Sequence, residues 1–120
     1  MEKYVLGDME QQFAKILWEK APITTREIID IGAKEFNWKR TTTYTMLKRL
    51  CDRGIFTNEK GTVMVVMSQE EFFANKSAFF LEESFDGSLP RFLTAFSRRK
   101  RLSDKEIKAI ERLIDEHKEG

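Results

Sequence analysis

Residues 38–54 contain a dense set of basic and hydroxyl side chains whose types and spacing suggest a binding function. At about 100° per residue, one face of a helix here collects residues that would pack on a core. They are Thr43, Met46, Leu47 and Leu50. The opposite side presents hydroxyls, a phenol and cations, from Thr41, Tyr44, Thr45, Lys48 and Arg49. Five cations, Lys39, Arg40, Lys48, Arg49 and Arg53, against one anion, Asp52, give this segment a local charge of +4.

A short basic helix of this kind suits DNA recognition. Lysine and arginine neutralise backbone phosphates, and hydroxyl groups bond phosphate oxygens or base edges. The segment therefore predicts a recognition helix. The alternative is an ordinary amphipathic surface helix whose basic face is only solvated.

Two helices and a short strand are predicted ahead of this segment. The first helix begins near Gly7 or Asp8 and ends before Pro22, because proline disfavours helix in the residue that precedes it. Residues 22–24 are extended. Thr24 and Glu27 have the spacing of a capping box, which opens a second helix that ends near residues 36–37.

After Gly54 the pattern changes to that of strands. Residues 55–58 and 62–67 are rich in β-branched and apolar side chains, and a short turn joins them, which predicts a β-hairpin. Helix, short strand, helix, basic helix and hairpin is the order of a winged helix-turn-helix domain. We expect this DNA-binding domain to fill residues 1–68.

Residues 69–120 are predicted to be helical. Ser68 with Glu71, Ser88 before a proline, and Ser103 with Glu106 each mark a helix start. Residues 98–101, Arg-Arg-Lys-Arg, interrupt this pattern as a basic loop. The fold class is thus mainly α with a small hairpin wing.

Six of the ten phenylalanines fall within about twenty residues of this second part. Short helices cannot bury so many aromatic rings by themselves, and a large exposed apolar surface usually marks an interface. We therefore expect residues 69–120 to form a homodimerisation domain across a two-fold axis. The residues expected in the interface are Phe72, Phe73, Phe79, Phe80, Phe85, Phe92, Phe96, Ile107, Ile110, Leu113 and Ile114. The alternative is a monomer whose tail helices fold back onto the winged helix.

Composition and motifs narrow the class of function. The chain has 120 residues, a net charge of +1 and one cysteine, so an intramolecular disulfide is excluded and a reducing compartment fits. The N-terminus has no long apolar run, so we expect a cytoplasmic protein without a membrane partner. Nucleophile motifs, glycine-rich phosphate loops and zinc-ligand spacings are absent. We expect no catalysis, no metal and no cofactor, and we interpret Cys51 as a small core residue, with a redox switch as the alternative.

The chain resembles the penicillinase-repressor family of bacterial transcriptional regulators, the BlaI/MecI/CopY type. The resemblance rests on an ordered set of segments at matching spacing, which spans nearly the whole chain. These segments are residues 16–19, 22–28, 38–50, 54–56, 85–89 and 102–107.

The resemblance implies a homodimeric repressor whose winged helix reads a palindromic DNA operator. It also places Thr42 among the DNA-facing positions, as the family-like threonine near the start of the third helix. The complete predicted DNA-binding set is Lys39, Arg40, Thr41, Thr42, Tyr44, Thr45, Lys48 and Arg49. The alternative function is a winged helix used as a protein-interaction module, because a fold does not fix a function.

Three departures from the family pattern affect these expectations. The hairpin tip is nearly neutral, which argues against strong wing contacts with DNA. The paired C-terminal cysteines of copper-responsive members are missing, which argues against copper sensing of that kind. The bond aligned with the Asn-Phe cleavage site of the penicillinase branch is Ala95-Phe96, so we expect no switching by an asparagine-specific protease.

Overall fold

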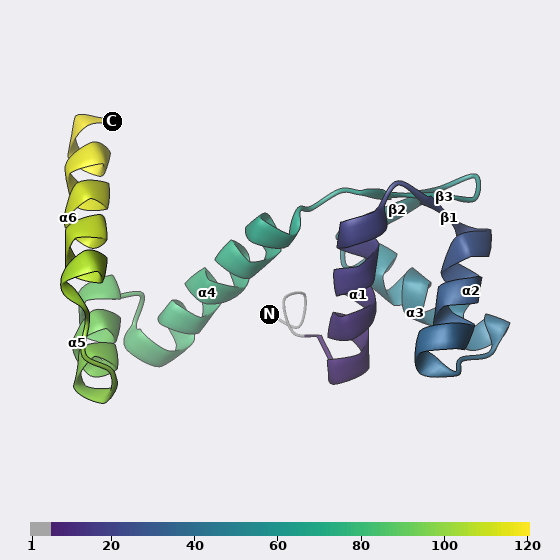
Figure 1. The fold of residues 1–120 in the computed structure, drawn as a ribbon, viewed down its shortest axis with the longest axis horizontal. Helices are drawn as coiled ribbons and strands as arrows, with labels where there is room; N and C mark the ends of the chain where they lie inside the picture. Colours follow the sequence, from purple (N-terminus) through teal and green to yellow (C-terminus); the bar gives the residue numbers. More distant parts are fainter. Residues whose placement is uncertain (1–5) are drawn as a thin grey trace. The chain divides into compact units, whose positions relative to one another are not determined.

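The computed structural model describes residues 6–120 (Figure 1). The elements follow one another as α1 (Asp8–Lys20), β1 (Ile23–Thr24), α2 (Thr25–Phe36), α3 (Arg40–Asp52), β2 (Phe56–Glu59), β3 (Thr62–Val65), α4 (Gln69–Phe85), α5 (Leu89–Arg99) and α6 (Asp104–Glu119). The chain forms two compact units, Met1–Phe79 and Phe80–Gly120. The predicted fold class is confirmed, with a winged helix at the N-terminus and helices at the C-terminus. The functional boundary expected after residue 68 stays a prediction.

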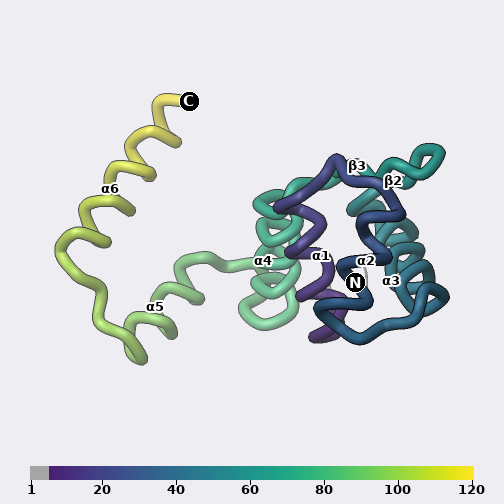
Figure 2. The backbone as a smooth tube through the Cα atoms, turned by 45° about the vertical axis from the view of Figure 1, so that its right-hand side comes forward, coloured from purple at the N-terminus to yellow at the C-terminus, as the bar shows by residue number. Residues whose placement is uncertain are grey.

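In the first unit, α1, α2 and α3 lie against one another beside a small sheet (Figures 1 and 2). Their apolar faces share one core with the hairpin, and burying these faces is what holds helices this short in place. The largest fully buried side chains are Phe13, Leu17, Ile28, Thr43, Leu50, Ile55, Phe56, Val63 and Phe72. On α1 the buried residues are Phe13, Ala14 and Leu17, whereas Met9 remains 41% exposed.

The sheet connects the wing to the helix-turn-helix. Its strand order is β1-β3-β2 and both pairs are antiparallel, with Ile23 opposite Val63 and Phe56 opposite Val65. The hairpin turns at Lys60 and Gly61, whose φ angles of 52° and 91° are those of a tight turn with two left-handed residues. The Gly61 carbonyl accepts a hydrogen bond from the Thr25 backbone N–H at 2.9 Å. The wing is therefore held against the first residue of α2.

The first turns of α4 complete the core of the first unit. The Ser68 hydroxyl accepts a hydrogen bond from the Glu71 backbone N–H at 3.0 Å, as the sequence predicts for a helix cap. Phe72 is only 1% exposed, and its ring centre lies 5.6 Å from that of Trp18 on α1. The Trp18 indole N–H donates to the Met67 carbonyl at 3.0 Å, which fixes the ring that Phe72 covers.

The second unit contains an aromatic cluster but has no buried core of its own. The rings of Phe80, Phe85, Phe92 and Phe96 contact one another, with centres about 6 Å apart. Neither α5 nor α6 buries a side chain. The start of α6 is fixed by the predicted capping box, in which Ser103 and Glu106 exchange two hydrogen bonds. Hydrogen bonding from Ser103 to its carboxylate lowers the pKa of the Glu106 carboxyl below its usual range.

Two local details differ from the sequence interpretation or add to it. The basic run expected as a loop begins inside α5, which continues to Arg99, so only its last two residues lie outside the helix. Within residues 6–120, no helix combines the length and the apolar character needed to cross a bilayer.

Candidate nucleic-acid interface

One face of α3 is fixed in the core and the other is open. Thr43, Met46, Leu47 and Leu50 are buried, as the spacing predicts. All eight residues of the predicted DNA-binding set are exposed on the remaining surface of α3 and its N-cap. Gly32 of α2 allows this arrangement, because a Cβ at that position would clash with the Thr43 hydroxyl oxygen. The close approach of α2 sets the side of α3 that faces outward.

The exposed residues of α3 also contact one another. Some of these contacts orient a side chain, and one pairs a cation with a carboxylate. The Arg40 guanidinium lies over the Tyr44 ring, 5.8 Å from its centre, a cation–π geometry that aligns both side chains on one face. The Thr45 hydroxyl donates to the Thr41 carbonyl at 3.0 Å and keeps its lone pairs for another donor. Lys48 forms an ion pair with Asp52 at 2.9 Å, in which the two side chains are 76% and 63% exposed. Such an exposed pair is weak and can open toward a phosphate.

Arg49 differs from the other predicted contact residues because it is directed toward α1. Its guanidinium lies 3.9 Å from Glu10, and Arg53 approaches the same carboxylate at 3.5 Å. Glu10 is only 13% exposed at its side chain, so this group anchors the C-terminal end of α3 to α1. The geometry favours a positioning role for Arg49 alongside any phosphate contact.

The sequence interpretation missed Arg26 at this surface. A groove between α2 and α3 is lined by Thr25, Arg26, Ile29, Asp30, Arg40 and Tyr44. Arg26 lies in the first turn of α2, directly after the Thr24 cap, where backbone N–H groups favour anions. The sequence signal that could have pointed to Arg26 is its position as a cation two residues after the predicted Thr24 cap. Two arginines and a phenol along one groove can hold a phosphate oxygen.

A second groove separates α3 from the wing. It is lined by Tyr44, Leu47, Lys48, Cys51 and Asn58. Asn58 was also missed, and its carboxamide oxygen accepts a hydrogen bond from the Gly61 N–H at 3.0 Å, which shapes the hairpin turn. Burial, with a smaller contribution from Asp52, raises the pKa of the Cys51 thiol above its usual range. The thiol therefore stays protonated at neutral pH, which fits a packing residue.

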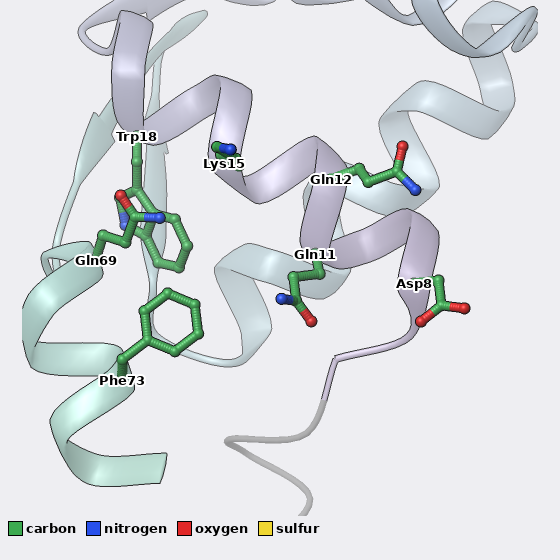
Figure 3. Close-up of a pocket in the computed structure, with 7 residues that line it drawn as sticks. All are labelled: Asp8, Gln11, Gln12, Lys15, Trp18, Gln69 and Phe73. Carbon is green, nitrogen blue, oxygen red and sulfur yellow. The ribbon is translucent and has the colours of Figure 1, made fainter. Parts of the chain in front are cut away.

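A third hollow lies between α1 and the beginning of α4, away from these grooves (Figure 3). Trp18 and Phe73 form its apolar wall, with ring centres 6.2 Å apart, and Gln11 and Lys15 belong to its polar rim. Within residues 6–120, the structure brings together no group of three or more histidine, cysteine or acidic residues that could hold a metal ion.

The residues predicted to dimerise fall into two groups. Phe72 is buried and Phe73 half-buried against Trp18, so their burial needs no second chain. Most of the others keep a large exposed area in the single chain, and Phe80, Phe96, Ile107, Leu113 and Ile114 are 48%, 38%, 41%, 64% and 48% exposed.

The family model described as penicillinase repressor matches residues 6–116, which include both units. The chain belongs to the penicillinase repressor family. It is 30% identical over 117 residues to the penicillinase repressor of Bacillus licheniformis, covering 94% of this chain and 91% of the relative. Members of this family are transcriptional repressors, which are regulators and not enzymes. The winged helix and its exposed basic helix are the parts of this penicillinase repressor family member that suit such a role.

Proposed function

We propose that this protein is a dimeric transcriptional repressor that binds a palindromic operator through α3. The single observation that carries the proposal is the orientation of α3. Its apolar face is buried against α1, α2 and the wing, while its cations, hydroxyls and phenol are exposed together. In a winged helix this exposed helix is the one expected to enter the major groove. The repressor would act in the cytoplasm, where its DNA partner lies.

Different residues have different roles in this proposal. Lys39, Arg40 and Lys48, with Arg26 from α2, bind backbone phosphates and set the register on the duplex. Tyr44 and Thr45 lie between them on the open face, where a phenol and a hydroxyl can meet base edges. Phosphate contacts supply affinity for any sequence, whereas base contacts supply the preference for the operator.

Dimerisation rests on the unburied apolar faces of the second unit. Helices whose apolar stripes remain open are marginal in water, and covering those stripes is the usual source of their stability. A second copy supplies an identical stripe, because a two-fold interface brings the same patch of both subunits together. The side chains proposed for this interface are Phe80, Phe85, Phe92, Phe96, Ile107, Ile110, Leu113 and Ile114, with Phe79 at the boundary of the units.

A mobility-shift assay tests the proposal with the full chain and a fluorescent duplex at about 50 and about 200 mM salt. Counterion release predicts that affinity falls by about 10³-fold or more between these conditions if six phosphates are contacted. The variant Lys39→Ala/Arg40→Ala/Lys48→Ala should bind much more weakly. The matched control Lys15→Ala/Lys20→Ala/Lys34→Ala loses the same charge from α1 and α2 and should bind nearly as the unmodified chain does. Absence of salt-dependent binding would favour the protein-interaction module instead.

A further inference from the structure

The second unit carries a dense group of cations that take no part in the DNA contacts proposed for the first unit. We call it the basic tail stripe, and its members are Arg98, Arg99, Lys100, Arg101, Lys105, Lys108 and Arg112. All seven side chains are exposed. Between residues 98 and 112 they outnumber the anions Asp104, Glu106 and Glu111 by seven to three, so this segment has a charge of +4.

The three helical members of the stripe on α6 share one side of that helix. Lys105, Lys108 and Arg112 are spaced by three and four residues and line one shallow hollow together with Asp104 and Ala109. At about 100° per residue, the apolar residues Ile107, Ile110 and Ile114 fall on the opposite side of α6. A second copy that covers the apolar side therefore leaves the cations facing water.

Within residues 6–120, no member of the stripe forms an ion pair closer than 4.0 Å. Among residues 6–120, the ion pairs closer than 4.0 Å join Lys48 to Asp52, Arg49 and Arg53 to Glu10, and Arg91 to Asp86. Within the stripe's own segment, the Glu106 carboxylate accepts a hydrogen bond from the Ser103 N–H at 3.0 Å and serves as a cap. The seven cations still exceed the three anions of their segment by four charges. Like charges on neighbouring exposed side chains repel one another, so this excess costs stability unless an external anion compensates for it.

We propose that the basic tail stripe binds the backbone phosphates of duplex DNA beside the segment that α3 contacts. This inference rests on the proposed function and adds a second DNA contact to it. Arginine predominates in residues 98–101, and its planar fork matches phosphate oxygens. No apolar side chain interrupts that run, so it has no membrane-inserting character of its own.

Two other partners, an anionic membrane and a second copy of this chain, fit the stripe less well. An anionic membrane would require the apolar side of α6 for insertion, and the C-terminal half of α6 carries Asp115, Glu116 and Glu119, which such a surface repels. A second copy is expected on the apolar side, opposite the stripe.

Chain length allows this contact. A helix rises about 1.5 Å per residue, so the 17 residues of α4 span about 25 Å. That is less than one turn of B-DNA, which is about 34 Å long. We therefore expect the contacts of the stripe to fall on phosphates within one or two turns of the segment that α3 contacts.

Titrations of full-length variants with fluorescein-labelled duplexes of arbitrary sequence, about 15 and about 40 base pairs long, test this. The stripe variant is Arg99→Gln/Arg101→Gln/Lys105→Gln/Lys108→Gln, and glutamine preserves helix propensity. The control is Lys15→Gln/Lys20→Gln/Lys34→Gln/Lys118→Gln, which removes the same charge from other exposed sites. Circular dichroism and the thermal midpoint show whether both variants remain folded.

On the longer duplex, log K should fall less steeply with log salt for the stripe variant than for the unmodified chain. The magnitude of the slope should be smaller by about 2–4, since each lost phosphate contact removes about 0.9. Its affinity at low salt should fall at least about ten-fold, and the control should retain the slope of the unmodified chain. On the short duplex, which offers fewer phosphates beside the segment that α3 contacts, the difference between the two variants should be smaller.

Equal slopes for the stripe variant and the control on the longer duplex would overturn the inference while leaving the proposed function intact. So would a stripe variant that only dissociates the dimer in sedimentation, or one that only loses binding to phosphatidylserine vesicles. If the unmodified chain shows no salt-dependent affinity for either duplex, the proposed function fails, and this inference fails with it.

Discussion

At the scale of single residues, the exposed face of α3 carries an acidic side chain that would compete with DNA for Lys48 in the proposed complex. The Asp52 carboxylate holds the Lys48 ammonium at 2.9 Å, one helical turn away. A phosphate that approaches Lys48 must displace this carboxylate and is also repelled by it. If α3 binds DNA as proposed, the pair should limit non-specific binding, and it costs little stability to open because both partners are exposed.

Asp52→Asn should strengthen binding to duplex DNA of any sequence. The substitution frees Lys48 and removes a negative charge beside the phosphates, so we expect an increase of up to about five-fold, from a pair worth about 0.2–1 kcal/mol. Fluorescence anisotropy at about 50 mM salt measures the effect. Glu19→Gln changes the net charge equally at an exposed site on α1 and should leave the affinity nearly unchanged. Weaker binding by Asp52→Asn would mean that Asp52 helps to orient Lys48 for its contact.

At the scale of elements, the contact between α2 and α3 sets which face of α3 is exposed. Gly32 is buried on α2 and faces Thr43, which is 1% exposed on α3. The Thr43 hydroxyl also donates to the Lys39 carbonyl at 3.3 Å, so its rotamer is constrained. The two helices can approach this closely only because residue 32 has no side chain.

Gly32→Ala should destabilise the first unit by about 1–3 kcal/mol, because the added methyl group must push α3 away or force Thr43 from its rotamer. Chemical denaturation followed by circular dichroism measures the loss. Thr43→Ala removes the atoms that clash, so the double variant Gly32→Ala/Thr43→Ala should be less destabilised than the sum of the two single variants. Strict additivity would show that the two residues are not in contact.

Local rules predicted the elements well and the contacts between them poorly. The caps at Thr24, Ser68, Ser88 and Ser103 each accept the expected hydrogen bond, because capping depends on residues three positions apart. The buried face of α3 also follows from periodicity alone. The direction of Arg49 toward Glu10 did not follow from these patterns, because that ion pair joins residues far apart in the chain.

At the scale of the whole molecule, the first turns of α4 belong to the first unit. The sequence places the domain boundary after residue 68, where a helix start is marked by Ser68 and Glu71. It could not reveal that Phe72, counted with the other tail phenylalanines, packs on Trp18 in the first core. Clustered aromatic residues look alike in sequence, and only the fold separates those that a single chain buries from those that it leaves open.

Truncation tests this division. A fragment of residues 1–79 should unfold cooperatively and remain monomeric, with weaker DNA binding than the full chain. A fragment of residues 1–68 lacks Phe72, and the loss of a buried phenylalanine costs about 3–5 kcal/mol, so it should be far less stable. Thermal unfolding and sedimentation velocity distinguish the two. Equal stability of both fragments would contradict the assignment of α4 to the first core.

The central claim, a two-fold repressor that reads DNA with α3, is tested most directly by selecting bound sequences from a random duplex library with the full chain. The selected sequences should form an inverted repeat with half-sites whose centres lie one or two helical turns apart, at about 34 Å per turn. Thr45→Ala should relax the preference at one position of each half-site, worth about 1–3 kcal/mol, and should retain non-specific affinity. An enriched site without two-fold symmetry, or a preference that Tyr44→Ala and Thr45→Ala leave unchanged, would contradict it.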